Sequence, residues 1–462
     1  MRPAPDAGSG SGPGRVTESD GGARAEPPVD HPRGSSVPAQ LARLGFTEVD
    51  RAAAALGRLG QVVAPAPPVG VSRPAVGVMT PVIVADRPVV AALAAAADPD
   101  LALAALERLV DALGPADGPR LLEELATHDG LRRRLCAVLG ASRALGDHLA
   151  RHPRDWAVLA PDALATARPD PGDARATLLR AVGAEPADPD PRAVGDSPAT
   201  LDALRVAYRR ELLVVAARDL TGAVALDAAT AELADLAGSA LDAALAIARA
   251  GLDPDLPAAR LAVIGMGKCG GRELNYVSDV DVLFVAEPRE PSGAGNVDEM
   301  LRAATRMAEG LVRAAGLVTS AGALFQVDPN LRPEGRDGAL VRTLDSHRAY
   351  YRRWARTWEF QALLKARPIA GDLELGADFC AMVAPLVWTA SSRPDFVADV
   401  RAMRQRVEST LSRTEETYCW SKGLPTSAYR LARTLAGSSS SGPWGNVTES
   451  RCGRLRCVGH ST

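Results

Sequence analysis

One stretch, LAVIGMGKCGGRELNYVSDVDVLFV at residues 261–285, constrains the fold more than any other part of the chain. It joins an apolar run of β type, a glycine-dense turn and a second apolar run that opens with Asp279 and Asp281. Side chains of a strand alternate between its two faces, so aspartates one residue apart share a face. The stretch predicts two strands with paired carboxylates beside a glycine turn. The alternative is a solvated strand face with two chance aspartates, which Lys268 in the turn and a third acid downstream make less favourable.

The glycines also match a dinucleotide-binding fingerprint. Gly265, Gly267 and Gly270 follow an apolar run with G-x-G-x-x-G spacing. That fingerprint opens a helix and has its acidic residue about 20 residues further on. Here the second strand begins near Asp279, and a parallel crossover with its helix needs at least about 10–12 residues. A Rossmann unit therefore does not fit, and the Gly-Lys-Ser/Thr ending of a P-loop is absent.

A third acid follows in the segment GALFQVDPNLRPEGRDGALVR, residues 322–342. Asp328 lies at the end of a predicted strand that could pair with the first. Arg332 and Arg336 come next and carry guanidinium groups suited to phosphate oxygens, with plain surface arginines as an equal alternative in so arginine-rich a chain.

Three carboxylates offer hard oxygen ligands, which suit Mg²⁺ or Mn²⁺ better than Zn²⁺. Two such ions can stabilise the attacking and leaving oxygens of an in-line displacement at phosphorus. The glycine turn lets backbone N–H groups approach a phosphate, Lys268 adds positive charge, and Ser278 could orient a carboxylate or touch a phosphate oxygen. With no Ser-His-Asp or Cys-His arrangement in the sequence, phosphoryl or nucleotidyl transfer is the economical interpretation.

Composition narrows the class of protein. The formal net charge of −3 gives no overall attraction to nucleic acid or anionic membranes. Aromatic residues make up only 4% against 47% hydrophobic residues, which favours helices packed through small side chains. The six cysteines show no C-x-x-C spacing, the first 40 residues lack a secretory pattern, and the apolar runs near 89–97 and 241–250 are too short to cross a bilayer. We expect a soluble, reduced, cytoplasmic protein with no nucleic-acid or membrane partner.

The periodicity of apolar residues and the breaks rich in glycine and proline divide the chain into five parts. We predict a disordered extension at 1–40, a helical region at 41–257, a catalytic domain at 258–375, the start of a helical bundle at 376–416 and an aberrant, disordered tail at 417–462. Within them we expect helices at 201–222, 226–250 and 298–316, a helix pair at 346–372, a basic helix at 398–411, breaks at 65–74 and 170–179, and a loop at 186–198.

Three further groups of side chains have two interpretations each. Arg205, Arg209 and Arg210 could contact a nucleotide or partner, but a solvated helix face is favoured. His148 and His152 have the i, i+4 spacing of half a metal site, but no third ligand accompanies them, so a surface or structural role is favoured. The aromatics of 346–372 are expected in the core, and Glu359, Lys365 and Arg367 are candidates for contacts just outside the site.

Three segments together resemble the bifunctional glutamine synthetase adenylyltransferase/adenylyl-removing enzymes. They are GMGKCGGRELNYVSDVDVLF, VDPNLRPEGRDGALV and YYRRWARTWEFQALLKARPIAGD. The resemblance covers at least residues 200–412 and is weaker upstream. This family carries two nucleotidyltransferase-fold units in tandem. The N-terminal unit uses inorganic phosphate to remove AMP from the adenylylated tyrosine of glutamine synthetase and releases ADP, and the C-terminal unit attaches AMP from ATP.

The single motif set of this chain resembles the N-terminal, adenylyl-removing copy. The resemblance implies an α+β fold, with a polymerase-β-like mixed sheet and helices preceded by a mostly helical region. It implies partners as well: adenylylated glutamine synthetase, inorganic phosphate, ADP or ATP, and a P-II-type nitrogen regulatory protein. Carried over by position, the catalytic and Mg²⁺-binding (or Mn²⁺-binding) acids would be Asp279, Asp281 and Asp328, and the phosphate-contacting turn would be Gly267, Lys268, Gly270, Gly271 and Ser278.

The end of the chain departs from the family pattern. The family continues with a Gly-Gly-Leu-Arg-Asp-Val-Glu-type segment, a helical bundle and the second catalytic unit, whereas this chain reads KGLPTSAYRLARTLAG. We therefore expect the tail to be a frameshifted or truncated reading of a longer protein. Two alternatives to adenylyl removal stay open: adenylylation of glutamine synthetase with ATP by the same unit, and a non-catalytic fragment that only binds glutamine synthetase or a regulator.

Overall fold

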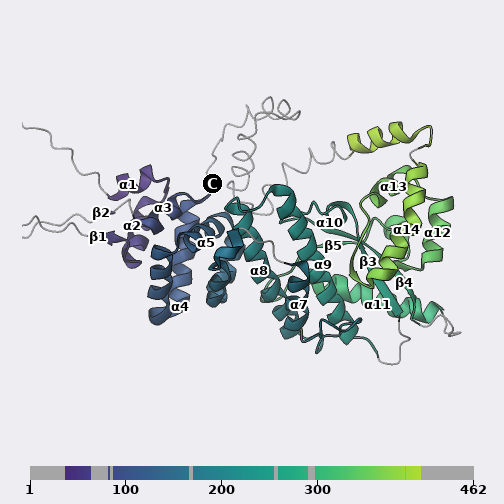
Figure 1. The fold of residues 1–462 in the computed structure, drawn as a ribbon, viewed down its shortest axis with the longest axis horizontal. Coiled ribbons are helices and arrows are strands. Elements are labelled where there is room, and N and C mark those ends of the chain that lie inside the picture. The colour runs from purple at the N-terminus through teal and green to yellow at the C-terminus, as the bar shows by residue number, and fades with distance from the viewer. Residues whose placement is uncertain are drawn as a thin grey trace, which may run out of the picture.

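The helices of the first half of the chain lead into a mixed β-sheet in the second half (Figure 1). The computed structural model describes residues 37–63, 82–83, 87–165, 170–253, 259–289, 297–390 and 392–406. The predictions for residues 1–36, for the break at 65–74 and for the tail at 417–462 lie outside these ranges. In the figure, the early helices gather at one end of the molecule and the sheet with its covering helices at the other.

The described N-terminal part is mostly helical, as predicted. Its α-helices are α1 (Val37–Arg43), α2 (Val49–Arg58), α3 (Pro88–Ala94), α4 (Pro99–Thr127), α5 (Asp129–Ala141), α6 (Arg143–Arg151), α7 (Pro171–Ala181), α8 (Pro198–Leu220) and α9 (Leu226–Ala250), with 3-10 turns η1 (Pro153–Leu159) and η2 (Asp162–Ala165). A two-stranded antiparallel ribbon of β1 (Val62–Val63) and β2 (Val82–Ile83) interrupts the helices, which sequence periodicity did not predict.

Helix α7 corrects the prediction of a break at 170–179. Asp170 accepts a hydrogen bond from the backbone N–H of Gly172, and Pro171 occupies the first helical position. An Asp-Pro pair that looks like a break is also a helix start, with aspartate at the N-cap and proline at the first helical position. Leu178 and Leu179 then bury themselves in the core, so tertiary packing continues what the cap begins. The predicted loop at 186–198 is confirmed up to its last residue, where α8 begins.

The sheet has five strands in a mixed arrangement: β3 (Ala259–Gly265), β4 (Val280–Pro288), β5 (Val327–Asp328), β6 (Val341–Arg342) and β7 (Arg367–Gly371). Strand β3 runs antiparallel to both β4 and β7. On its other side β4 pairs in parallel with β5 near its start and with β6 further along. The expected α+β class with a mixed sheet and a preceding helical region is confirmed.

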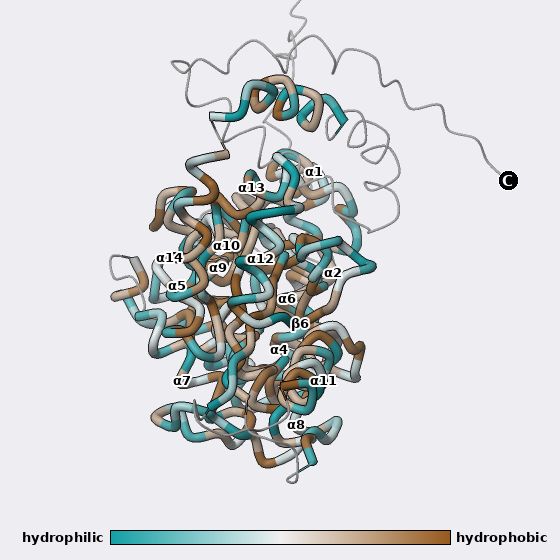
Figure 2. The backbone as a smooth tube through the Cα atoms, turned by 90° about the vertical axis from the view of Figure 1, so that its right-hand side faces the viewer, coloured by the Kyte–Doolittle hydropathy of each residue, from teal (hydrophilic) through white to brown (hydrophobic). Residues whose placement is uncertain are grey.

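Each face of the sheet is covered by helices because the buried strands alternate their apolar side chains. Val282 and Phe284 of β4 face α9 and α11 (Val297–Gly316), whereas Leu283 and Val285 face the other way. That second face is covered by α12 (Leu344–Arg353), α13 (Thr357–Leu363) and α14 (Leu373–Ala390). Figure 2 shows hydrophobic and hydrophilic residues alternating along these helices, as expected for elements with one buried side.

One predicted feature of the C-terminal part needs correction. Residues 346–372 are not a helix pair throughout, because Arg367–Gly371 forms β7 at the sheet edge. Among the described residues, α14 is the one helix long and apolar enough to span a membrane, a weak indication that core helices of soluble proteins also give. Its Leu375 and Phe379 are buried against the sheet, which gives the helix a packing role. Residues 396–406 are helical, so the predicted helix at 398–411 is confirmed as far as residue 406, where the described residues end.

Candidate functional site

The predicted acids meet at one end of the sheet. Asp281 in β4 and Asp328 in β5 are direct partners in a parallel pair, and the backbone N–H of Val280 donates to the carbonyl of Gln326 at 2.9 Å. Asp279 precedes β4 and is exposed. Asp328 also accepts a hydrogen bond from the N–H of Asn330 at 2.8 Å, which fixes its carboxylate at the strand end. The structure therefore brings together acids that are far apart in the sequence.

The electrostatics of this end are unbalanced. Burial, together with the nearby charges of Asp328 and Asp279, raises the pKa of Asp281 to about 6, while Lys268 opposes the rise. A buried carboxylate whose pKa is raised by neighbouring acids lacks full compensation by positive charge. The position is therefore one where a cation would be stabilising.

The donor set fits a hard divalent cation in its chemistry. All three side chains offer oxygen, and two come from strands held in register. Within the described ranges, no three His, Cys, Asp or Glu side chains converge closely enough to form a ready-made cage. A cation here would have to draw the carboxylates inward, and Mg²⁺ commonly completes its shell with water and substrate phosphates.

The glycine turn lies directly beside Asp281. The N–H of Met266 donates to the carbonyl of Asp281 at 2.9 Å, after which the chain turns into the short helix α10 (Gly267–Gly270). Gly267 has φ of 51°, and a Cβ there would collide with the Asp281 carboxylate. Glycine at this position is required by conformation and by space.

Some backbone amides of the turn donate hydrogen bonds within the turn itself. The N–H of Gly270 donates to the Met266 carbonyl at 2.8 Å, and the N–H of Gly271 donates to the Gly267 carbonyl at 3.1 Å. Gly270 is also packed so closely against the carbonyl of Lys365 that a side chain could not fit. Gly270 and Gly271 would therefore contribute to a phosphate site through the shape they allow the turn to take. The amides of Gly267 and Lys268, at the start of α10, do not take part in these two hydrogen bonds.

The remaining predicted contacts occupy the rim. Lys268 is exposed next to the acids, and Ser278 is half-buried just before β4. Arg332 donates to the carbonyls of Gly338, Pro329 and Arg336 at 2.9–3.0 Å, so it braces the loop after Asp328. Arg336 is exposed within the 3-10 turn η3 (Gly335–Asp337). Their predicted phosphate role stays a prediction, and the structure adds a structural role for Arg332.

Side chains expected just outside the site have defined partners. Glu359 is buried and accepts from the N–H of Arg356 at 2.7 Å, which caps α13. Lys365 pairs with Glu273 of the turn at 2.5 Å. Arg367 donates to carbonyls of the turn itself. Cys269 in α10 is buried, and burial raises the pKa of its thiol to about 12, so it stays protonated.

The arginines of α8 are not a solvated face, which corrects the favoured interpretation. Arg205 is fully buried and donates to the carbonyls of Ala314, Leu317 and Gly322 at 2.5–2.9 Å. Arg209 donates to the carbonyl of Ala321 in the same turn. Sequence periodicity missed this role because unpaired carbonyls at the end of α11 attract donors that a helix pattern cannot anticipate. Arg210 remains more than half exposed.

The histidine pair has a structural role, as predicted. His148 is buried and its Nε2 lies 2.9 Å from Asp155, while the rings of His148 and His152 stand 5.0 Å apart. Burial, with the neighbouring His148, lowers the pKa of His152. This pair therefore stabilises the junction of α6 and η1.

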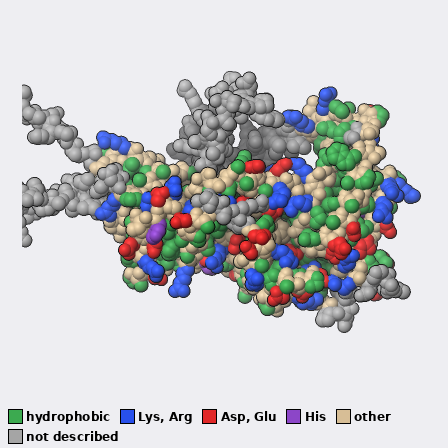
Figure 3. All heavy atoms as spheres, viewed as in Figure 1, with side chains coloured by type: hydrophobic (Ala, Val, Ile, Leu, Met, Phe, Trp, Pro, Cys, Tyr) green, Lys and Arg blue, Asp and Glu red, His purple; other side chains and the backbone are tan. Residues whose placement is uncertain are grey.

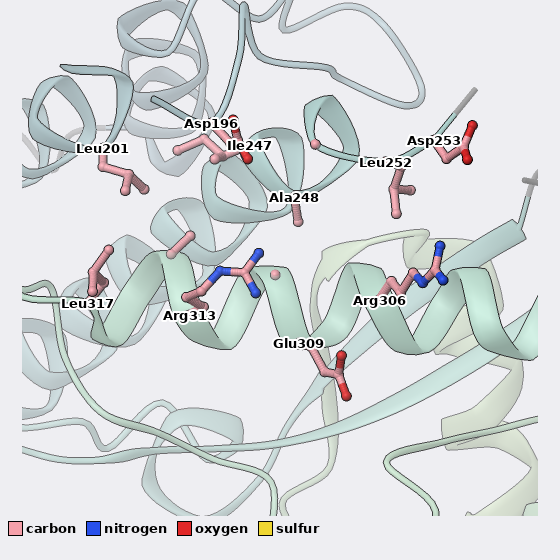
Figure 4. A pocket seen from close by; sticks show the side chains of 13 residues that line it. Asp196, Leu201, Ile247, Ala248, Leu252, Asp253, Arg306, Glu309, Arg313 and Leu317 are labelled. Carbon is pink, nitrogen blue, oxygen red and sulfur yellow. The ribbon is translucent and has the colours of Figure 1, made fainter. Parts of the chain in front are cut away.

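A pocket of about 260 Å³ lies elsewhere, between the end of α9 and the outer side of α11 (Figure 4). Arg306 and Arg313 point toward it while Glu309 points away in that view. None of the predicted acids or turn residues lines it. On the face seen in Figure 3, acidic and basic side chains are interspersed, in keeping with the small net charge.

Known proteins match this chain over most of its described length. The family model for glutamate-ammonia ligase adenylyltransferase matches residues 132–382. A "bifunctional glutamine synthetase adenylyltransferase/adenylyl-removing enzyme" of Streptomyces avermitilis is 53% identical over 70% of this chain and 30% of the relative. Proteins with the same name from Streptomyces coelicolor and Mycobacterium tuberculosis are 46% and 43% identical, over 83% and 76% of this chain and 35% and 33% of the relatives.

The family model covers more than half of the chain. The chain belongs to the glutamate-ammonia ligase adenylyltransferase family, whose named relatives are enzymes, and the resemblance seen in its motifs is confirmed. It spans about a third of the length of each relative.

Proposed function

We propose that this chain is a nucleotidyltransferase-fold unit that removes AMP from adenylylated glutamine synthetase, using inorganic phosphate and releasing ADP. The names of the relatives support glutamine synthetase as the protein substrate. The wording of the motifs, similar to the N-terminal copy of the family, supports the direction. Phosphate, ADP and a P-II-type regulatory protein are the further partners that the resemblance implies, in the cytoplasm.

The observation that carries the proposal is the pairing of Asp281 with Asp328 beside Gly267. Two segments, the stretch 261–285 and the strand that carries Asp328, thereby place two carboxylates and the glycine turn at one end of a mixed sheet. A phosphate group would bind against amides of this turn and Lys268, and cations held by the acids would balance its charge.

The reaction is a displacement at the α-phosphorus of the tyrosine-linked AMP. An oxygen of inorganic phosphate forms a new bond to phosphorus, the bond from phosphorus to the tyrosyl oxygen breaks, and the phenolate takes a proton from solvent. The amides of Gly267 and Lys268 would orient the attacking phosphate, and the Lys268 ammonium would attract it. Asp279, Asp281 and Asp328 would hold Mg²⁺ or Mn²⁺, which neutralises charge on the phosphoryl oxygens when bound.

The test is to incubate the purified chain with adenylylated glutamine synthetase, phosphate and Mg²⁺, and to measure ADP. We expect release from the wild type and a fall of roughly 100-fold or more for Asp281→Asn, the scale on which removed transition-state stabilisation acts. Asp345→Asn is the matched control, because Asp345 is an exposed acid on α12. No release by the wild type, or equal release by Asp281→Asn, would refute the proposal.

The relatives' names contain both directions of reaction, so a second arm supplies ATP and unmodified glutamine synthetase. Transfer of AMP to the protein in that arm, without ADP release in the first, would assign adenylylation instead. Inactivity in both arms together with binding of glutamine synthetase would identify a non-catalytic binding unit.

A further inference from the structure

A single carboxylate on α9 holds two arginines that come from different segments behind the glycine turn. Asp235 is largely buried and pairs with Arg272, which follows the turn, and with Arg367 in β7 at 3.7 Å. None of the three belongs to the predicted acids or to the predicted phosphate contacts. The cluster therefore needs a separate explanation.

Arg367 acts directly on the backbone of the turn. Its Nη2 donates to the carbonyl of Cys269 at 3.1 Å and its Nε to the carbonyl of Gly270 at 3.2 Å. These carbonyls form the C-terminal end of α10, where the helix dipole favours a cation. Two bonds from one planar guanidinium fix the direction of this end of the turn, and hence of its opposite end beside Asp281.

Arg272 holds the exit of the turn in an unusual conformation. Its φ of 57° lies in the left-handed region that residues other than glycine rarely adopt. The ion pair to Asp235 and a 3.4 Å hydrogen bond from Thr230 Oγ1 to its carbonyl tie it to α9. Strained backbone persists where the surroundings determine it, and such positions concentrate at functional sites.

The scaffold behind this cluster is closely packed. Gly238 on α9 packs so closely against the carbonyl of Ile369 in β7 that a Cβ would stand 2.9 Å from that oxygen. Helix α9 and strand β7 are therefore in close contact next to Asp235 and Arg367. These contacts hold α9 against β7 next to the turn.

We propose that Arg367, anchored by Asp235 together with Arg272, is a positioning residue that aims the amides of Gly267 and Lys268 at the phosphate. This role rests on the proposed function for its consequence, because the aimed amides would bind the attacking phosphate. Arg367 itself touches backbone and carboxylate, so it acts through the turn.

The kinetic test compares Arg367→Ala and Arg367→Lys with the wild type. A misaimed turn binds phosphate less well in ground and transition states alike, so we expect the KM for phosphate to rise about tenfold or more with a smaller change in kcat. Lysine cannot span both carbonyls and should rescue only partly. Added guanidinium ion should lower the KM of Arg367→Ala. A fall in kcat at unchanged KM would overturn the proposal.

Arg260→Ala is the matched control. Arg260 is exposed to the same degree as Arg367, 28% against 29%, and likewise pairs with an aspartate, Asp372, but at the opposite end of β3. We expect its KM for phosphate to match the wild type. If Arg260→Ala raises KM as much as Arg367→Ala, general destabilisation explains both and the positioning role fails.

Hydrogen exchange separates this inference from the proposed function. In Arg367→Ala, amides of residues 266–273 should exchange faster than in the wild type and in Arg260→Ala, whether or not ADP is formed. Asp235→Asn should produce the same change and serves if Arg367→Ala does not fold. Unchanged exchange in a folded variant overturns the inference, whereas absence of ADP from the wild type overturns only the proposed function.

Discussion

Gly267 shows how much of the candidate site depends on one residue without a side chain. Its left-handed backbone and its contact with the Asp281 carboxylate leave no room for a Cβ. We expect Gly267→Ala to lower ADP release at least about tenfold and to destabilise the fold by roughly 1–2 kcal/mol. Gly57→Ala in α2, where a Cβ meets nothing, should leave both unchanged or slightly improve stability. Wild-type activity in Gly267→Ala would show that the turn is not pressed against the acid.

His347 gives the fold a predictable dependence on pH. It is buried under the sheet, stacked on Tyr351 and edge-on to Phe379, and burial lowers its pKa to about 3. The unfolded chain takes up a proton near pH 6.5 that the folded chain refuses. Through His347, the free energy of unfolding is therefore highest above pH 6.5. It falls by about 1.4 kcal/mol per pH unit as the pH drops from there toward 3.

His347→Phe keeps the ring and removes this titration. Between pH 7 and pH 5 the wild type should lose about 2 kcal/mol more of its free energy of unfolding than the variant does. Urea unfolding at both pH values measures the difference. Equal losses would mean that His347 accepts a proton in the folded state.

At the scale of elements, Arg205 joins α8 to the end of α11. Replacing it by methionine would keep much of its volume but remove the guanidinium that donates to the carbonyls of Ala314 and Leu317. We expect Arg205→Met to cost about 2–4 kcal/mol of unfolding free energy, measured by urea denaturation. Arg210→Met on the same helix, at a largely exposed position, should cost less than about 0.5 kcal/mol. Similar costs for both variants would contradict the role of Arg205 in joining α8 to the end of α11.

Local pattern predicted the elements that depend on local signals. The helix at 226–250 and the strand carrying Asp281 follow from periodicity and glycine stops, and the structure has both. Helix α7 and strand β7 were missed because a short segment takes its conformation from its neighbours: β7 from the free edge of β3, α7 from the core that buries Leu178.

The same limit applies to the site. Asp281 and Asp328 could be singled out from the sequence, which also allowed their strands to lie side by side. The register that makes the two acids direct partners could not be predicted, because the whole fold determines it. The phosphate contacts expected of Gly270 and Gly271 rested on the family resemblance, carried over by position. Their amides bond within the turn, a detail that backbone geometry decides.

Over the whole molecule, α8 connects the helical region to the sheet. Leu213 and Ala217 belong to the N-terminal core, whereas Leu201 and Leu204 belong to the core beneath the sheet. The N-terminal helices are thus packed onto the element that holds the turn before β5 in place through Arg205. The candidate site and the helical region form a continuous structure.

The most direct test of the central claim is the fate of the attacking phosphate. Adenylylated glutamine synthetase is incubated with this chain, Mg²⁺ and ¹⁸O-labelled inorganic phosphate, and the released nucleotide is analysed by mass spectrometry. Phosphorolysis at the acid pair predicts ADP that carries the label in its β-phosphate, with loss of the product in Asp281→Asn. Unlabelled AMP, or no nucleotide at all from the wild-type chain, would contradict it.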